Sequence, residues 1–257
     1  MTAMEDQPWM TAIQPLLDMT HHVRDLGKLL TVAEVGVRSL PGEADLDNSL
    51  GYTEGKLRDM ALREMQNDFS LLHGMATVLL WSVLEAHLRS FLVKWLQHQP
   101  NPLQPLRDNE AAYKQYRKDL KVSLINLETM DPESRAEHIL EQLEGALRGM
   151  STIGIVRFEK LLELLGLGGD VEDETKDTLR EVRAIRNLFA HQAGVADARF
   201  CEQCPTIGVE GQRVKVLGHR LREYIEAVVY YGQVVINRVV RKHDPDWGED
   251  LEDEDDD

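Results

Sequence analysis

The chain has 257 residues, of which 42% are hydrophobic. This is enough for one large globular domain, with or without extensions, around a substantial core. The formal net charge is −16, but residues 244–257 hold ten acidic residues and no Lys or Arg, which leaves −6 for the rest of the chain. The most apolar window, Met75–Leu84, is too short to cross a bilayer, and no basic region followed by an apolar run marks a signal peptide. Together with only two cysteines, these features predict a cytoplasmic protein without a membrane partner.

The first predicted helix covers residues 5–35, where apolar residues recur at helical spacing and Pro15 starts or kinks the helix. Residues 36–53 are rich in Gly, Pro, Asp, Asn and Ser, which predicts a loop or hinge. We therefore expect residues 1–53 to form an amino-terminal helical arm and loop, separate from the core that follows.

The second predicted helix runs through residues 54–99 without a break. Gly74 is unfavourable in a helix by about 1 kcal/mol, so we expect it to mark a close packing contact. Apolar residues surround the helix from Leu72 to Trp95, which predicts a place in the middle of a bundle. Glu85 stands within this apolar run. It either pairs with an arginine or orients the motif residues described below.

Three more helices are predicted before the motif. Residues 107–128 carry a basic cluster and two tyrosines, for which a solvated helix face and a nucleic-acid track are alternatives. Asp131 and Pro132 are a capping residue and a first-turn proline for a helix that ends near Gly149. Ser151 is the expected cap of a helix over residues 152–165. Its inward-facing residues are predicted to be Ile155, Phe158, Leu161, Leu162 and Leu165.

The segment after residue 194 carries the only β signal of the chain. Polar and apolar residues alternate in Gln212–Val216, which predicts a short strand or hairpin near 205–217. A final helix is expected over 219–242. The acidic residues 244–257 are expected to be a disordered tail, because such a density of like charge cannot collapse. The fold class that follows is all-α with one small β insertion.

The motif helix is predicted over residues 172–194, with carboxylates at its start and Gly194 as the residue that ends it. Its apolar stripe consists of Val182, Ile185 and Phe189. Within an arc of roughly 140°, turned largely away from that stripe, lie Arg183, Arg186, Asn187 and His191. Two guanidiniums, an amide and an imidazole on one face form an anion-binding surface.

Arg186–His191 has the pattern R-N-x-x-x-H, and the next residues extend it to H-x-x-G-x-x-D at Asp197. The pattern resembles the signature of HEPN domains, all-α proteins found widely among nucleases and toxins. In these domains a polar residue, often Asn, follows the Arg, and a His stands four to six positions after the Arg. The trailing part is similar to a variant in bacterial members, as is Leu84-Glu85-Ala86 upstream. The resemblance implies a HEPN-like helical bundle over residues 54–243.

The resemblance implies a metal-independent endoribonuclease, such as a bacterial toxin or phage-defence effector, that needs no cofactor. Arg186 is expected to stabilise the charge of the transition state, His191 to act as general base or acid, and Asn187 to hold the geometry. Glu85 and Glu181 are expected as second-layer partners that orient these groups. The resemblance also implies a homodimer in which two motif helices meet to form one composite site, and an antitoxin or regulatory protein is a further expected partner.

Arg183 is a substrate-binding candidate on its position alone, since it lies one turn before Arg186 and is not part of the family pattern. Residues 180–222 contain eight basic and four acidic residues, a basic island in an acidic protein. That sign of charge suits a polyphosphate ligand, so we expect RNA as substrate or ligand.

Two alternatives remain open at the level of sequence. The motif residues can cap carbonyls or pair with Glu85 or Glu181, so that the chain is a non-catalytic module that binds RNA, a nucleotide or a protein. Cys201 and Cys204 form a single C-x-x-C, for which reduced thiols in a loop and a zinc site completed by His191 and His219 are alternatives. Because structural zinc needs four ligands and no second pair is present, we expect no metal.

Overall fold

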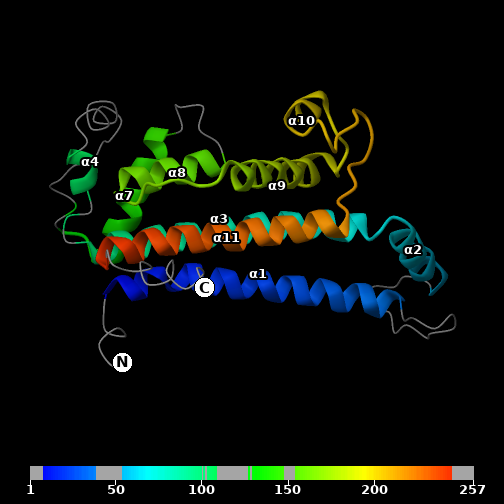
Figure 1. Ribbon diagram of the computed structural model, residues 1–257, viewed down its shortest axis with the longest axis horizontal. Helices are drawn as coiled ribbons and strands as arrows, with labels where there is room; N and C mark the ends of the chain where they lie inside the picture. The colour runs from blue at the N-terminus through cyan, green and yellow to red at the C-terminus, as the bar shows by residue number, and fades with distance from the viewer. Residues whose placement is uncertain are drawn as a thin grey trace, which may run out of the picture. The chain divides into compact units, whose positions relative to one another are not determined.

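The structure is a computed structural model, and it describes residues 8–38, 54–99, 101, 103–108, 127, 129–147 and 154–244. These residues are mostly helical and include no strand, which confirms the all-α class (Figure 1). The helices are α1 (Pro8–Arg38), α2 (Glu54–Gln66), α3 (Ser70–His98), α4 (Gln104–Asp108), α7 (Pro132–Leu147), α8 (Ile155–Leu164), α9 (Asp173–Gln192), α10 (Ala198–Gln203) and α11 (Gly218–His243).

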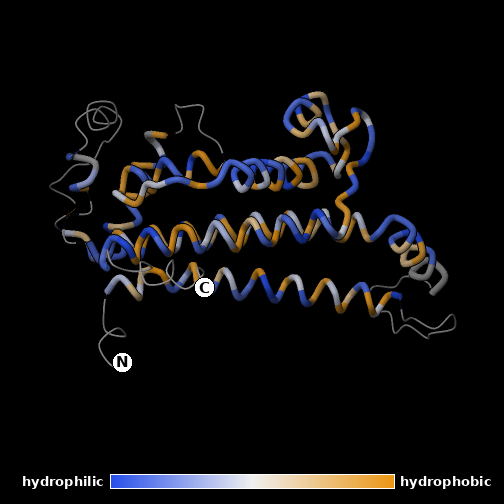
Figure 2. Tube along the Cα trace, viewed as in Figure 1, coloured by the Kyte–Doolittle hydropathy of each residue, from blue (hydrophilic) through white to orange (hydrophobic). Residues whose placement is uncertain are grey.

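Most of the predicted helices form within a few residues of their expected bounds. Figure 2 shows polar and apolar residues alternating along the long helices, as amphipathic elements require. At the start of α7, the Asp131 carboxylate accepts backbone N–H bonds from Glu133 at 3.1 Å and from Ser134 at 3.0 Å, as the predicted cap should. All five residues predicted to face inward near α8 are buried. That helix begins after Gly154, and the predicted cap Ser151 lies outside the described residues.

The prediction of one unbroken helix over 54–99 is wrong, because the chain turns between α2 and α3. Asp68 and Phe69 have positive φ angles of 51° and 53°. The turn is stabilised by tertiary contacts: Phe69 is 1% exposed, and Asp68 accepts a bond from the Gly218 N–H at 3.2 Å. Ser70 Oγ likewise accepts from the Val216 N–H at 3.0 Å. These contacts with distant residues outweigh the local helix propensity.

The predicted strand or hairpin near 205–217 is not confirmed. The structure has turns there and one isolated antiparallel bridge, between Val195 and Arg213. The alternation itself is present, since Val214 and Val216 are buried between exposed neighbours. The helix predicted over 107–128 and the acidic tail lie almost wholly outside the described residues.

The chain divides into two compact units, and the division into an arm, a bundle and a tail stays a prediction. The first unit comprises residues 1–19, 85–176 and 230–257, and the second comprises residues 20–84 and 177–229. Helix α1 supplies buried apolar side chains to both units. These side chains are Trp9, Ala12, Ile13, Leu16, Met19, Val23 and Leu30.

The first unit is held by a half-buried ion pair, a tyrosine hydrogen bond and an aromatic contact. Glu159 of α8 accepts from the Tyr231 hydroxyl at 2.6 Å and pairs with Arg238 at 2.9 Å, which ties α8 to α11. Burial, together with the charge of Glu159, raises the pKa of Tyr231. At the end of α11 the His243 ring stacks on Trp9 of α1, with centroids 5.5 Å apart.

The second unit contains the motif helix and a buried histidine. His73 of α3 is 1% exposed; its Nδ1 donates to the Val216 carbonyl at 3.0 Å, and its Nε2 lies 2.8 Å from Glu34 Oε1 of α1. Glu181 of α9 accepts from the Tyr224 hydroxyl of α11. The His73 contacts join α1, α3 and the segment before α11, and the Glu181 contact joins α9 to α11.

By length and composition alone, α3 could cross a bilayer, with a mean hydropathy of 1.3 over its most apolar window of 18 residues. Of that window, 44% is buried within the protein. A single such helix is weak evidence of a membrane span, because the core helix of a soluble protein passes the same test.

Candidate functional site

The motif helix α9 is fixed by its apolar stripe, which leaves the polar face outward. Val182 and Ile185 are fully buried and Phe189 is 8% exposed. A Cβ placed on Gly74 of α3 would lie 2.2 Å from the Phe189 ring, so only glycine permits this approach. The close contact expected at Gly74 is therefore confirmed, and it holds the carboxyl-terminal half of α9 against α3.

The end of α9 explains the glycine of H-x-x-G-x-x-D. The helix ends at Gln192, and both Ala193 and Gly194 have positive φ, at 52° and 82°. The Gly194 N–H donates to the Leu188 carbonyl at 3.2 Å, while its own carbonyl accepts from the Val214 N–H at 2.8 Å. A left-handed backbone and a Cβ position only 3.1 Å from the Phe189 ring both favour glycine at position 194.

Asp197 explains the final residue of the same pattern. It is the N-cap of α10, where its side chain accepts from the Phe200 N–H at 2.7 Å. The second carboxylate oxygen accepts from Gln192 Nε2 at 2.7 Å, which ties α10 to the last residue of α9. The hydrogen bond from Gln192, followed by that from Phe200, lowers the pKa of Asp197 below its ordinary value. Asp197 therefore positions α10 beside the motif.

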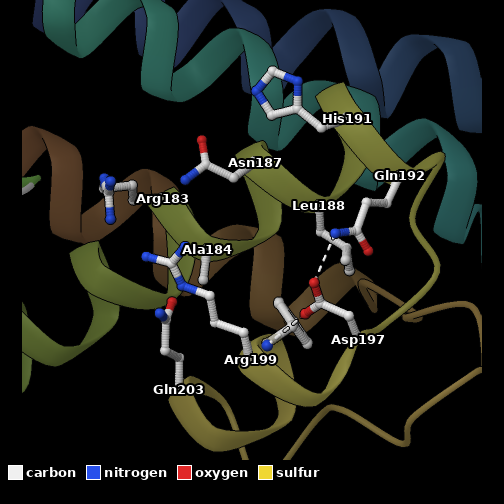
Figure 3. A pocket seen from close by; sticks show the side chains of 10 residues that line it. Arg183, Ala184, Asn187, Leu188, His191, Gln192, Asp197, Arg199 and Gln203 are labelled. Carbon is white, nitrogen blue, oxygen red and sulfur yellow. Dashed lines mark hydrogen bonds between the residues drawn. The ribbon is translucent and has the colours of Figure 1, made fainter.

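A pocket of about 300 Å³ lies between α9 and α10. In Figure 3, Arg183, Asn187 and His191 follow one another along α9, and Arg199 and Gln203 of α10 lie across from them. The full lining is Arg183, Ala184, Asn187, Leu188, His191, Gln192, Asp197, Arg199, Phe200 and Gln203. Guanidinium, amide and imidazole groups thus converge on one hollow, which suits an oxygen-rich anion.

The structure brings three of the four predicted motif-face residues into the pocket and leaves Arg186 off its lining. Arg186 is half-buried, and its Nη1 donates to Asn187 Oδ1 at 3.0 Å. This bond leaves the Asn187 Nδ2 group as a donor. Arg186 lies at the edge of the polar arc, which is why its side chain contacts Asn187 rather than the hollow.

His191 is exposed and makes no hydrogen bond or ion pair with another described residue. An imidazole in this state is open to solvent, to a ligand and to a second protein chain. Transfer of a proton to or from a bound substrate needs such access.

The two glutamates expected to orient the motif are placed differently. Glu181 binds α11, where it accepts from the Tyr224 hydroxyl and lies 3.4 Å from Arg220 Nε. Its carboxylate is thus occupied away from the pocket lining. Glu85 is half-buried and begins the stretch of α3 that belongs to the other compact unit, so its orienting role stays a prediction.

Sequence reasoning missed Arg199 and Gln203, because it missed α10. A helix of six residues is too short for periodicity to reveal it. The one local signal was Asp197, whose residue type favours an N-cap. Arg199 and Gln203 are four positions apart in the sequence, which places them on the same side of α10, and both line the pocket.

The two cysteines are free thiols in and just after α10. Burial, and next the charge of Glu181, raises the pKa of the Cys204 thiol to about 12. The described residues contain no group of three or more His, Cys, Asp or Glu side chains placed to hold a metal ion.

Comparison of the chain with protein-family models, with curated proteins and with solved structures finds no match. Fold and site together define an all-α protein with a basic, amide-rich pocket beside an exposed histidine.

Proposed function

We propose that this protein is a metal-independent endoribonuclease of the HEPN type, which cleaves RNA at the α9–α10 pocket. One observation carries the proposal: His191, exposed and without a hydrogen bond or ion pair to any described residue, shares a hollow with the side chains of Arg183 and Asn187. The R-N-x-x-x-H pattern resembles that of the family, and the all-α fold is of the class the family requires. The HEPN-like bundle over 54–243, with its β insertion, belongs to this proposal.

The proposed reaction needs only the groups that an RNA chain and this pocket supply. A base removes the proton of a ribose 2′-hydroxyl, the 2′-oxygen attacks the adjacent phosphorus, and the bond from phosphorus to the 5′-oxygen breaks. An acid returns a proton to that 5′-oxygen, so the products are a 2′,3′-cyclic phosphate and a 5′-hydroxyl. Arginine and amide donors stabilise the negative charge that develops on the phosphate oxygens.

We assign the roles from the positions of the side chains. His191 transfers the proton, and Arg183 contacts the phosphate from the preceding turns of α9. Asn187 donates its Nδ2 group to a phosphate oxygen, while Arg186 holds the Asn187 amide through the 3.0 Å bond. The family pattern implies that Arg186 also stabilises charge directly, which requires its side chain to turn toward the pocket when substrate binds.

One chain supplies one imidazole at this pocket, whereas acid–base cleavage is best served by two ionising groups. A homodimer that joins two copies of α9 supplies the second. Met75 and Leu79 belong to α3, the helix whose Gly74 contacts Phe189 of α9, and they are 55% and 50% exposed. Exposed apolar side chains on this helix support a second copy of the chain as their partner.

The deciding experiment is cleavage of a labelled RNA in the presence of EDTA. We expect a 2′,3′-cyclic phosphate product from the wild-type protein and loss of cleavage in His191→Ala and Arg186→Ala. The control is Arg222→Ala, which removes an exposed arginine of the basic island outside the pocket. Circular dichroism shows whether each variant keeps its fold. Cleavage that persists in a folded His191→Ala protein would contradict the proposed chemistry.

The alternative is a HEPN-like module that binds RNA, a nucleotide or a protein without cleavage. The position of Arg186 off the pocket lining favours it, because the pocket of one chain then lacks the arginine of the family pattern. In that case RNA binds with an affinity that falls with salt, and no product forms.

As an enzyme of this family, the protein would be a toxin or antiviral defence effector in the cytoplasm, restrained by an antitoxin or regulatory protein.

A further inference from the structure

The α10 side of the pocket carries a charge that no described residue neutralises by an ion pair. Arg199 is exposed and makes no hydrogen bond or ion pair with another described residue. The acid nearest to it in sequence, Asp197, uses one oxygen for the Phe200 N–H and the other for Gln192. Among the described residues, the Arg199 guanidinium therefore has no hydrogen-bond acceptor, and its five donors can serve a ligand.

The pocket consists of two facing rows of side chains. On α9 the row is Arg183, Asn187 and His191, at intervals of four residues, which places them along one face of the helix. On α10 the row is Arg199 and Gln203, also four residues apart. Figure 3 shows the Arg199 guanidinium and the Gln203 amide lying together across the hollow from α9.

The chemistry of the α10 row suits a phosphate with its attached nucleotide. A guanidinium binds phosphate oxygens in pairs, and a carboxamide such as that of Gln203 both donates to and accepts from polar edges of a sugar or base. The pocket volume of about 300 Å³ is at the small end of the range for ligand sites, roughly 300–1,000 Å³. It therefore suits one nucleotide unit of an extended strand rather than a folded RNA.

We infer that Arg199 and Gln203 of α10 form a nucleotide subsite that holds the phosphate next to the one cleaved beside His191. This inference rests on the proposed function, because it treats RNA as the ligand of the pocket. Asp197 is the positioning residue of the subsite: its two hydrogen bonds place α10 across from α9. Arg199 binds substrate and takes no part in proton transfer.

The test measures binding of a short fluorescent single-stranded RNA by anisotropy, in a His191→Ala background that does not cleave it. Arg199→Ala should weaken the affinity by about tenfold or more, as loss of charged hydrogen bonds does. It should also make the slope of log affinity against log salt shallower by about 0.7, the effect of one lost phosphate contact on a single strand. Gln203→Ala should weaken the affinity without changing the salt slope.

Arg222→Ala is the matched control, since it removes the same charge from an exposed helix face outside the pocket. The inference is wrong if Arg199→Ala and Arg222→Ala lower the affinity and the salt slope equally. In the otherwise wild-type enzyme, Arg199→Ala should raise KM with little change in kcat, because it removes binding shared by ground state and transition state. A fall in kcat at unchanged KM would also overturn the assigned role.

The outcomes separate the subsite from the proposed function. If the wild-type protein cleaves RNA but Arg199→Ala and Arg222→Ala lower the affinity and the salt slope equally, the subsite is wrong and the proposed ribonuclease function stands. A second outcome is that calorimetry shows a mononucleotide binding through Arg199, while the wild-type protein neither binds nor cleaves RNA. The proposed ribonuclease function would then be wrong, and a phosphate site would remain. That result also removes the assignment of RNA as its ligand.

Discussion

Gly74 shows how a single residue controls the position of the motif helix. Its missing side chain lets the Phe189 ring lie where a Cβ would approach it to 2.2 Å. The sequence indicated a tight contact there, because glycine is unfavourable in the middle of a helix. It could not indicate the partner, since Gly74 and Phe189 are far apart in the chain and periodicity carries no information about which helices meet.

Gly74→Ala should lower the free energy of unfolding by about 1–3 kcal/mol, because the added methyl group overpacks the contact with Phe189. Gly145→Ala is the control: this glycine lies in α7, and a Cβ there meets nothing within 4 Å. That change should raise the free energy of unfolding by about 0.5–1 kcal/mol through better helix propensity. Denaturant unfolding measures both. Stabilisation by both substitutions would mean that the Phe189 contact gives way without cost.

Cys204 offers a second prediction, because burial raises the pKa of its thiol to about 12. At pH 8 only about one thiol in 10⁴ is then the reactive thiolate. Iodoacetamide should therefore modify the half-buried Cys201 well before Cys204 in the native protein, and both at similar rates in denaturant. Mass spectrometry of the digested protein gives the two rates. Equal rates in the native state would contradict the buried environment of Cys204.

The motif residues show what a helical arc can and cannot predict. The placement of Arg183, Asn187 and His191 on one face follows from a period of 3.6 residues, and the structure brings them to one pocket. Arg186 sits at the edge of that arc, where rotamer and neighbours decide the outcome, and its bond to Asn187 draws it away from the hollow. The partners of Glu181 were likewise set by tertiary packing, which spacing along one helix cannot show.

At the scale of elements, the long helices α1, α9 and α11 were predictable because each repeats apolar residues over many turns. The turn at Asp68 and Phe69 was not, because its stabilising contacts come from residues about 150 positions away. Helix α10 was missed for the opposite reason: it is so short that only its capping residue marks it. The pocket depends on that short element, so the part of its lining that α10 supplies (Arg199, Phe200 and Gln203) could not be anticipated.

Helix α10 should be unusually sensitive to its N-cap. Asp197→Ala removes the bonds to the Phe200 N–H and to Gln192, which should increase amide hydrogen exchange across residues 198–204. It should also weaken RNA binding as Arg199→Ala does. Asp197→Asn is the control, because asparagine caps helices about as well as aspartate and can still bond Gln192. Unchanged exchange in Asp197→Ala would show that packing alone holds α10.

The pH dependence of α10 has a definite sign. Because the pKa of Asp197 is lowered in the folded protein, its bonds stabilise α10 above the ordinary Asp range. That contribution falls as the pH drops through the ordinary range and is lost once the pH passes below the lowered folded pKa. In Asp197→Asn the exchange protection of residues 198–204 should not change over this window.

At the scale of the whole molecule, charge and stoichiometry bear on function more than fold does. The net charge of −16 would repel RNA, so the proposed RNA binding requires the local basic island rather than the average charge. Two of its arginines, Arg183 and Arg199, lie on opposite sides of one pocket. The single imidazole of that pocket in each chain is the feature that points beyond one subunit.

A mixing experiment decides whether two chains share one site. Wild-type protein is unfolded and refolded together with rising proportions of His191→Ala, so that subunits combine at random. If cleavage needs His191 from both chains of a homodimer, activity per total protein should fall as the square of the wild-type fraction, to about a quarter at equal mixing. If each chain cleaves alone, activity should fall to about half.

Co-refolding with Arg222→Ala controls for losses during refolding, because that variant keeps its pocket intact and should leave activity near the wild-type value. Sedimentation at the assay concentration measures whether dimers are present. If activity falls linearly with the fraction of His191→Ala, the shared site is wrong, and the groups of one pocket perform the acid–base chemistry. A quadratic fall would place His191 of two subunits at the same phosphate, because only a site that needs both chains loses activity as the product of their fractions.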